Sequence, residues 1–228
     1  TVLKDIIDIL IEKCVLENVK GIYMIGSHAR GETDELSDID ILVITSKITM
    51  NLEKSIYSLV LISEEKLNQS LKKNMIYYYP MLKEAKTLIN SELIEKYKRV
   101  NLNSESVLSY VISTRKMIEK IEKLIEIDKK IGSITTGDSV AYSLVLRLRG
   151  IYILDCLIKS KSWSKKGLKR LVDDSLYQGY LRVKNNVKLK DNIYILDAER
   201  MICCIKLFLE KLQKWGKEKT RKKQGRRD

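Results

Sequence analysis

Residues 21–45 read GIYMIGSHARGETDELSDIDILVIT, two apolar runs separated by a polar segment. The first run, residues 21–25, is short and is closed by Gly26, which predicts a buried strand. The second run, residues 38–45, begins Asp-Ile-Asp and continues as Ile-Leu-Val-Ile-Thr, which predicts a second strand. The sequence therefore indicates a strand–turn–strand unit with two acidic residues at the head of the second strand.

The two acids, Asp38 and Asp40, are spaced so that both side chains leave the same face of the predicted strand. Two neighbouring carboxylates repel each other unless a cation lies between them. Mg²⁺ is a hard cation that proteins hold through one or two carboxylates together with phosphate oxygens of a substrate. Asp38 and Asp40 are therefore our candidate metal ligands and catalytic residues.

The turn before the acids has the composition of a phosphate-binding loop. Gly26 has no side chain to keep a phosphate from the backbone, and Ser27 offers both an N–H group and a hydroxyl. A short helix is expected over residues 28–32, and Arg30 would present a charged fork to the phosphates. Gly26, Ser27 and Arg30 are our candidate nucleotide-binding residues.

The turn sequence at residues 26–31 and the Ser-Asp-Ile-Asp sequence at residues 37–40 resemble the polymerase-beta-like nucleotidyltransferase superfamily. The sequence of these two motifs is most similar to the minimal and kanamycin-nucleotidyltransferase-like branches of that superfamily. The motif covers residues 19–45, and the layout extends to about residue 100. The resemblance implies a palm domain with a small mixed sheet, bound Mg²⁺, and ATP or another nucleoside triphosphate as substrate.

This chain departs from the superfamily at the third carboxylate, which usually comes from the next strand. The strand predicted next, residues 56–62, places Tyr57 or Ser58 where that acid would lie. Glu53 precedes this strand and Glu64 follows it, so either could serve only in another register. Losing a general base costs about two to four orders of magnitude in rate. The site is then slow, takes its base from the substrate, or binds nucleotide without turnover.

The remaining N-terminal sequence alternates helical and extended patterns. Residues 2–17 carry a helical apolar stripe, and residues 64–73 form an amphipathic helix with Ser63 as its cap. Residues 81–100 predict a helix, an extended piece and a second helix. The three strands and these helices predict an α+β fold for residues 1–102.

Beyond residue 102 the sequence is helical. Long helices are predicted over residues 104–130, 138–159, 164–185 and 197–215, which indicates a four-helix-type bundle over residues 103–216. HEPN-type helical domains accompany some members of the superfamily, and their ribonuclease activity uses an Arg-to-His motif. The helical half has no histidine, so that activity is not expected here.

The formal net charge is +13, and residues 217–228 form a basic tail that supplies +5 of it. This excess favours a polyanion such as RNA as partner, whereas a short basic tail is also commonly only solvated. Residues 177–188 interleave tyrosines with basic residues, which suits either base stacking or a bundle helix with a basic face. No apolar run is long enough to span a bilayer, so no membrane partner is expected.

The four cysteines, Cys14, Cys156, Cys203 and Cys204, form no CxxC pair and are interpreted as buried apolar residues in a reducing, cytoplasmic interior. The leading hypothesis is a Mg²⁺-dependent nucleotidyltransferase acting on a hydroxyl acceptor, with RNA as the favoured acceptor. The first alternative is a degenerate nucleotide- or RNA-binding protein, or the antitoxin-like half of a pair. The second is a general basic RNA-binding protein, and a protein partner or homo-oligomer stays open.

Overall fold

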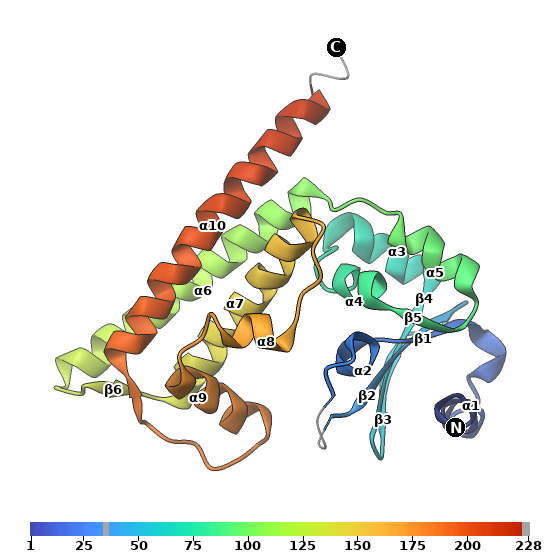
Figure 1. The fold of residues 1–228 in the computed structure, drawn as a ribbon, viewed down its shortest axis with the longest axis horizontal. Helices are drawn as coiled ribbons and strands as arrows, with labels where there is room; N and C mark the ends of the chain where they lie inside the picture. Colours follow the sequence, from blue (N-terminus) through green and yellow to red (C-terminus); the bar gives the residue numbers. More distant parts are fainter. Residues whose placement is uncertain (34–36, 225–228) are drawn as a thin grey trace. The chain divides into compact units, whose positions relative to one another are not determined.

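The computed structural model describes residues 1–33 and 37–224 (Figure 1). The chain divides into two compact units, Thr1–Asn103 and Ser104–Asp228. The first unit contains a five-stranded sheet with helices on it, and the second is helical apart from one two-residue strand pair. The predicted α+β fold, with a small sheet followed by a helical bundle, is confirmed.

The N-terminal sheet has the strand order β3-β4-β2-β1-β5. The central pair, β2 and β4, is parallel, whereas every other neighbouring pair is antiparallel, so the sheet is mixed. The strands span Val19–Met24 (β1), Ile39–Thr45 (β2), Met50–Lys54 (β3), Tyr57–Ser63 (β4) and Lys86–Ile89 (β5).

Helix α1 (Val2–Glu12) covers one face of this sheet, and its side chains Ile6 and Leu10 pack with Ile41 and Leu59 in a buried cluster. The other helices of the unit lie on the opposite side (Figure 1): α2 contacts β2, α3 contacts β4, α5 contacts β1, and α4 packs on α2 and α5. They span Gly26–Arg30 (α2), Glu64–Lys73 (α3), Tyr79–Glu84 (α4) and Ser91–Lys98 (α5). A short 3-10 turn, Leu16–Asn18, leads into β1.

Helices α6 and α10 lie side by side in the C-terminal unit, and α7 packs against α9 and α10 (Figure 1). Two short antiparallel strands of two residues each join the α6–α7 connection (β6) to the α9–α10 connection (β7). The elements span Ser104–Lys130 (α6), Thr135–Thr136 (β6), Asp138–Ile158 (α7), Lys165–Lys169 (α8), Asp174–Lys184 (α9), Ile193–Tyr194 (β7) and Ile195–Gln224 (α10). In the described part of the chain, no helix combines the length and the apolar character needed to cross a membrane.

Two predicted bundle helices have different limits. The helix predicted over residues 164–185 is broken into α8 and α9, because Asp173 stands in extended conformation at the N-cap of α9 and two acids there favour a new helix start. The helix predicted to end at residue 215 continues as α10 to Gln224 and takes in the described part of the basic tail. Lys, Arg and Gln are good helix formers, which explains the extension.

Strand β3 and the pair β6–β7 were not predicted. The sequence of β3, Met-Asn-Leu-Glu-Lys, has only Leu52 half-buried, because β3 is an edge strand with polar flanks. The strands β6 and β7 have two residues each, which is too short for any alternating pattern.

The predicted burial of the cysteines is wrong for two of the four: Cys14 and Cys203 are exposed, whereas Cys156 is buried. Cys14 has a positive φ of 55°, which places it in a turn after α1 and outside the core.

The segment at residues 177–188 is largely structural. Tyr180 is buried and stacks on Tyr142, with ring centroids 5.6 Å apart. Arg182 donates hydrogen bonds of 2.7 and 2.6 Å to the carboxylate of the buried Asp138. Tyr180 and Arg182 of this segment are therefore engaged within the bundle, which favours the bundle-helix interpretation.

Candidate functional site

The register of β1 and β2 brings the Gly-Ser turn to the acidic residues. In this antiparallel pair Val19 lies opposite Thr45 and Met24 lies opposite Ile41, so the end of β1 meets the beginning of β2. The next residue, Ile25, donates its N–H to the carbonyl of Asp40 at 2.9 Å. Gly26 consequently begins α2 directly beside Asp40, two residues before the helix start predicted from the sequence.

Gly26 is required at this place for two physical reasons. Its φ of +70° is a conformation that residues with a side chain rarely adopt. A Cβ atom on Gly26 would also lie only 2.1 Å from Oδ2 of Asp40. The Asp40 carboxylate thus occupies the space that glycine leaves open, and it is half-buried there.

Asp38 lies one residue before β2 begins, not within it as predicted, and it is exposed. The residue before it, Ser37, is held to α2 by a hydrogen bond: Nε2 of His28 lies 3.3 Å from the carbonyl oxygen of Ser37. The structure therefore gathers the turn, Asp38 and Asp40 at the same end of β2.

A partly buried acid that the sequence did not single out, Glu84 at the end of α4, also contacts the turn. Its Oε1 accepts the N–H of Gly26 at 2.8 Å, and its Oε2 accepts Nη1 of Arg30 at 2.5 Å. Nε of Arg30 donates to Glu32 at 2.9 Å. Burial opposes the charge on Arg30, but the hydrogen bonds and charges of Glu32 and Glu84 outweigh it and raise the Arg30 pKa. The fork of Arg30 thus holds two carboxylates in this structure.

The pairing of β4 decides which side chains share the face of Asp40. In the parallel pair Asp40 lies opposite Ser58, and in the next, antiparallel pair Ser58 lies opposite Glu53 on β3. Paired residues of a sheet direct their side chains to the same face. Asp40, Ser58 and Glu53 therefore form a row across three strands. Tyr57 lies on the opposite face, where its hydroxyl donates to Asp5 of α1 at 2.6 Å.

A comparison with protein families matches residues 3–135 to the nucleotidyltransferase domain. The chain belongs to this family. Among solved structures, a nucleotidyltransferase-like protein from Exiguobacterium sibiricum 255-15 is similar, at 18% identity and a TM-score of 0.35, over 91% of this chain and 72% of that one. No curated protein matches the sequence.

Within this nucleotidyltransferase, Ser58 stands beside Asp40, at the place where the superfamily usually has a third carboxylate. Tyr57 is ruled out by the face it occupies, and Glu53 comes next along the row. Ser58, and not Tyr57, therefore stands at the position of the third carboxylate.

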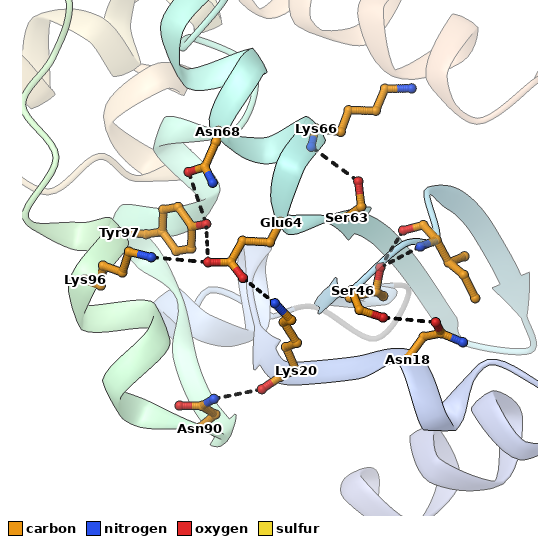
Figure 2. Close-up of polar contacts among 12 residues, drawn as sticks. Asn18, Lys20, Ser46, Ser63, Glu64, Lys66, Asn68, Asn90, Lys96 and Tyr97 are labelled. Atoms are coloured by element: carbon orange, nitrogen blue, oxygen red, sulfur yellow. Dashed lines mark hydrogen bonds and ion pairs between the residues drawn. The ribbon is translucent and has the colours of Figure 1, made fainter.

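Glu64 cannot serve the same site, because it follows β4 at the end opposite to Ser58. Its two carboxylate oxygens bind Lys20 at 2.6 Å and Lys96 at 3.2 Å, and the hydroxyl of Tyr97 donates to it at 3.3 Å (Figure 2). The hydrogen bond from Lys20 is the main reason that the Glu64 pKa is lowered. Glu64 is therefore a neutralised structural acid.

The nucleotidyltransferase site contains donors that fit a hard divalent cation. Asp38 and Asp40 supply carboxylates at one strand end, and the absence of a side chain on Gly26 lets the Asp40 carboxylate pack against the turn. Within residues 1–33 and 37–224, no group of three or more His, Cys, Asp or Glu side chains is placed to hold a metal. Two carboxylates suffice for Mg²⁺ when substrate phosphates and water complete its coordination.

Proposed function

We propose that this nucleotidyltransferase transfers a nucleoside monophosphate from a triphosphate, with ATP as the leading candidate, to a hydroxyl acceptor. The observation that carries the proposal is the packing of the Asp40 carboxylate against Gly26, which unites the acidic pair and the Gly-Ser turn. A turn without a Cβ gives phosphates access to the backbone, and the neighbouring acids provide ligands for the cation that accompanies a triphosphate.

Each residue has a role in this proposal. Asp38 and Asp40 hold Mg²⁺, which when bound neutralises charge on the phosphates. Ser27 donates its N–H and hydroxyl to the terminal phosphates, and Gly26 allows the close approach of Asp40 to the turn. Arg30 supports the phosphates by exchanging one of its carboxylate partners for them.

The reaction forms a bond between the acceptor oxygen and the α-phosphorus, and it breaks the bond between that phosphorus and the oxygen bridging to the β-phosphate. Pyrophosphate leaves, and the acceptor hydroxyl gives up its proton. Ser58 is a poor base for that proton. Glu53, the next residue in the row, is the carboxylate that the sheet register offers on this face.

RNA is our proposed acceptor because the chain carries a formal net charge of +13. A basic excess of this size attracts polyanions and makes their binding dependent on salt. The described part of the tail lengthens α10, which makes its basic residues part of a continuous helix.

The proposal is tested by incubating the full chain with Mg²⁺, bulk RNA and labelled ATP, GTP, CTP or UTP in turn. Asp38→Asn and Asp40→Asn are each expected to lower labelling by about 10³-fold, similar to the loss of a principal electrostatic stabiliser. Glu64→Gln is the matched control, because it removes an acid from the other end of β4. Equal labelling by wild type and the two Asn variants contradicts the proposal.

A second function, nucleotide binding with little turnover, is favoured by one observation: Ser58 stands beside Asp40 where the superfamily usually has an acid. Such a protein could act as the nucleotide-binding or antitoxin-like half of a pair. Calorimetry would then show Mg-ATP binding that Asp40→Asn abolishes, without any labelled product. Co-purification with a small helical partner that contains histidine would support the antitoxin version.

A further inference from the structure

The connection from α7 to α8, together with α8 and the residue after it, is basic and contains no acid. This basic segment, residues 159–170, reads KSKSWSKKGLKR. All six of its cationic side chains are exposed: Lys159, Lys161, Lys165, Lys166, Lys169 and Arg170. Lys159 and Lys169 lie near carboxylates. In the part of the chain that the structure describes, Lys161, Lys166 and Arg170 form no ion pair, so their charges face solvent.

The basic segment is held against α7, which limits where its single tryptophan can lie. Ser164 donates its N–H to the hydroxyl of Tyr152 on α7 at 3.4 Å. The Ser164 side chain caps α8 by accepting the N–H of Gly167 at 2.9 Å. The preceding residue, Trp163, is half-buried. One indole ring is thus held among exposed cations.

A second group of aromatic and basic side chains follows one face of α10. This stripe consists of Phe208, Lys211, Trp215 and Lys219. Their spacing of three, four and four residues places them on the same side of the helix. Nζ of Lys211 lies 5.3 Å from the ring centroid of Phe208. Nζ of Lys219 lies 6.0 Å from the ring centroid of Trp215. Both lysines are exposed, so each ring has a face that a solvated group can reach.

The basic segment and the stripe lie near each other within the second unit. Cys204 stands one turn before Phe208 on the same face of α10. Burial is the main cause that raises the pKa of the Cys204 thiol, while Lys211 lowers it and Asp173 raises it further. Asp173 is the N-cap of α9, three residues after Arg170. The end of the basic segment therefore approaches the beginning of the stripe.

The composition of this surface matches single-stranded RNA. Aromatic rings bind unpaired bases by stacking, and exposed cations between the rings bind the phosphates. Phe208 and Trp215 are separated by roughly 10 Å along the helix axis, so each ring can take a base of its own. A duplex keeps its bases stacked on one another and offers none to such rings.

We propose that residues 159–170 and the stripe on α10 form a binding surface for single-stranded RNA, with Trp163 and Trp215 as stacking platforms. This inference rests on the proposed function for the choice of RNA, and it deepens that function by naming the part of the chain that holds the acceptor strand. The surface differs from residues 177–188, where Tyr180 and Arg182 are engaged within the bundle.

The first test measures how the full chain, without nucleotide, binds a labelled oligouridylate of about 20 nucleotides by fluorescence anisotropy at several salt concentrations. One variant combines Lys161→Gln, Lys166→Gln and Arg170→Gln. If each cation neutralises one phosphate, the slope of log K against log salt should fall by about 2, since each contact to a single strand contributes about 0.7. The same slope predicts a loss of affinity of about 100-fold at 0.1 M salt.

The matched control combines Lys116→Gln, Lys120→Gln and Lys123→Gln in α6, which removes the same number of exposed charges. Helix α6 bonds to α10 through Lys206 and Gln213, on the side of α10 opposite to the stripe. The control should keep the slope and lose less than about threefold in affinity. Equal losses in the two variants would show general attraction by charge, and they would overturn the inference.

Stacking is tested with a strand of the same length that has no bases. Wild type should bind oligouridylate at least about fivefold more tightly than the abasic strand. Trp215→Leu should reduce this difference without changing the salt slope, and Trp215→Tyr, which keeps a ring, should restore it. A purely structural Trp215 would weaken both strands alike, and that result overturns the stacking role. Trp163→Leu is measured in the same way if Trp215→Leu does not fold.

Wild type alone provides a further measurement, because Trp163 and Trp215 are the two tryptophans of the chain. Unlabelled oligouridylate should quench their fluorescence, and the abasic strand should not. Equal binding of both strands, or binding without quenching, overturns the inference. If RNA binds as expected but no labelled product forms with any nucleotide, the proposed transfer fails and the surface stands. The two failures are therefore distinguishable.

Discussion

The two ends of the β2–β4 pair both contain acidic residues, but these residues have different neighbours. At the end after Ser63, Glu64 is held by two lysines and a tyrosine hydroxyl (Figure 2). At the beginning of β2, Asp40 lies against Gly26, and Gly26 itself is bonded to a further carboxylate, Glu84. At the Glu64 end one carboxylate has two lysine partners, whereas at the Asp40 end Glu32 and Glu84 share Arg30 and Asp40 packs against Gly26.

This difference distinguishes a structural acid from a candidate binding site. Glu64 is neutralised by Lys20 and Lys96, so ligand binding is not needed to relieve its charge. At the Asp40 end Arg30 binds Glu84, and a divalent cation held by Asp38 and Asp40 would reduce the repulsion between those two carboxylates. The contrast therefore supports a metal–triphosphate site at the Asp40 end, and substitutions at the two ends should have different consequences.

The largest effect is expected at Gly26. Gly26→Ala would put a Cβ 2.1 Å from Oδ2 of Asp40 and also force a φ of +70° on alanine. We expect a loss of about 2–4 kcal/mol in the free energy of unfolding, because overpacking adds to the backbone cost, and loss of nucleotidyl transfer as Asp40 is displaced. Thermal unfolding and the labelling assay measure the two effects.

Gly31→Ala is the control for this change. Gly31 has nearly the same φ, +71°, but a Cβ there meets nothing within 4 Å. Its cost should be only about 1 kcal/mol, from the backbone alone. If the two alanine variants lose equal stability and activity, the close approach of Asp40 to Gly26 has no special importance.

An intermediate effect is expected at Ser58. Ser58→Asp adds a carboxylate directly beside Asp40 and should raise the rate of transfer by about 100-fold, the lower limit of the range for a general base. It should also increase the thermal stabilisation given by Mg²⁺, since a third carboxylate strengthens binding of the cation. The rate is measured with labelled ATP, and the stabilisation by unfolding with and without Mg²⁺.

A double-mutant test with Glu53 accompanies this prediction. If Glu53 already serves as base across Ser58, Glu53→Gln should slow the wild-type protein but have little effect in the Ser58→Asp background. Such non-additivity is the signature of two residues that share one role. A Ser58→Asp protein with unchanged rate and unchanged response to Mg²⁺ contradicts the proposed position of the third carboxylate.

The sequence could predict that the Gly-Ser turn lies next to Asp40, because consecutive antiparallel strands place the end of one beside the start of the next. It could not predict the choice between Tyr57 and Ser58, which depends on the register of β4 against β2. It also missed Glu84, which reaches Gly26 across 58 positions of sequence from a short helix. Local sequence patterns carry no information about such a long-range pairing.

The smallest effect is expected at the other end, at Glu64. Its lowered pKa means that the folded chain favours the ionised form, so Glu64 stabilises the fold above the pKa of the unfolded chain and loses this contribution as the pH falls through the folded value. Glu64→Gln should therefore cost about 0.5–1 kcal/mol at pH 7, as for a partly exposed ion pair, and nothing once the pH is below the lowered pKa of Glu64. Chemical unfolding at a series of pH values measures the difference. Mg-ATP binding should be the same in both proteins, and a loss of binding in Glu64→Gln would show that the two ends of the β2–β4 pair are not separate in function.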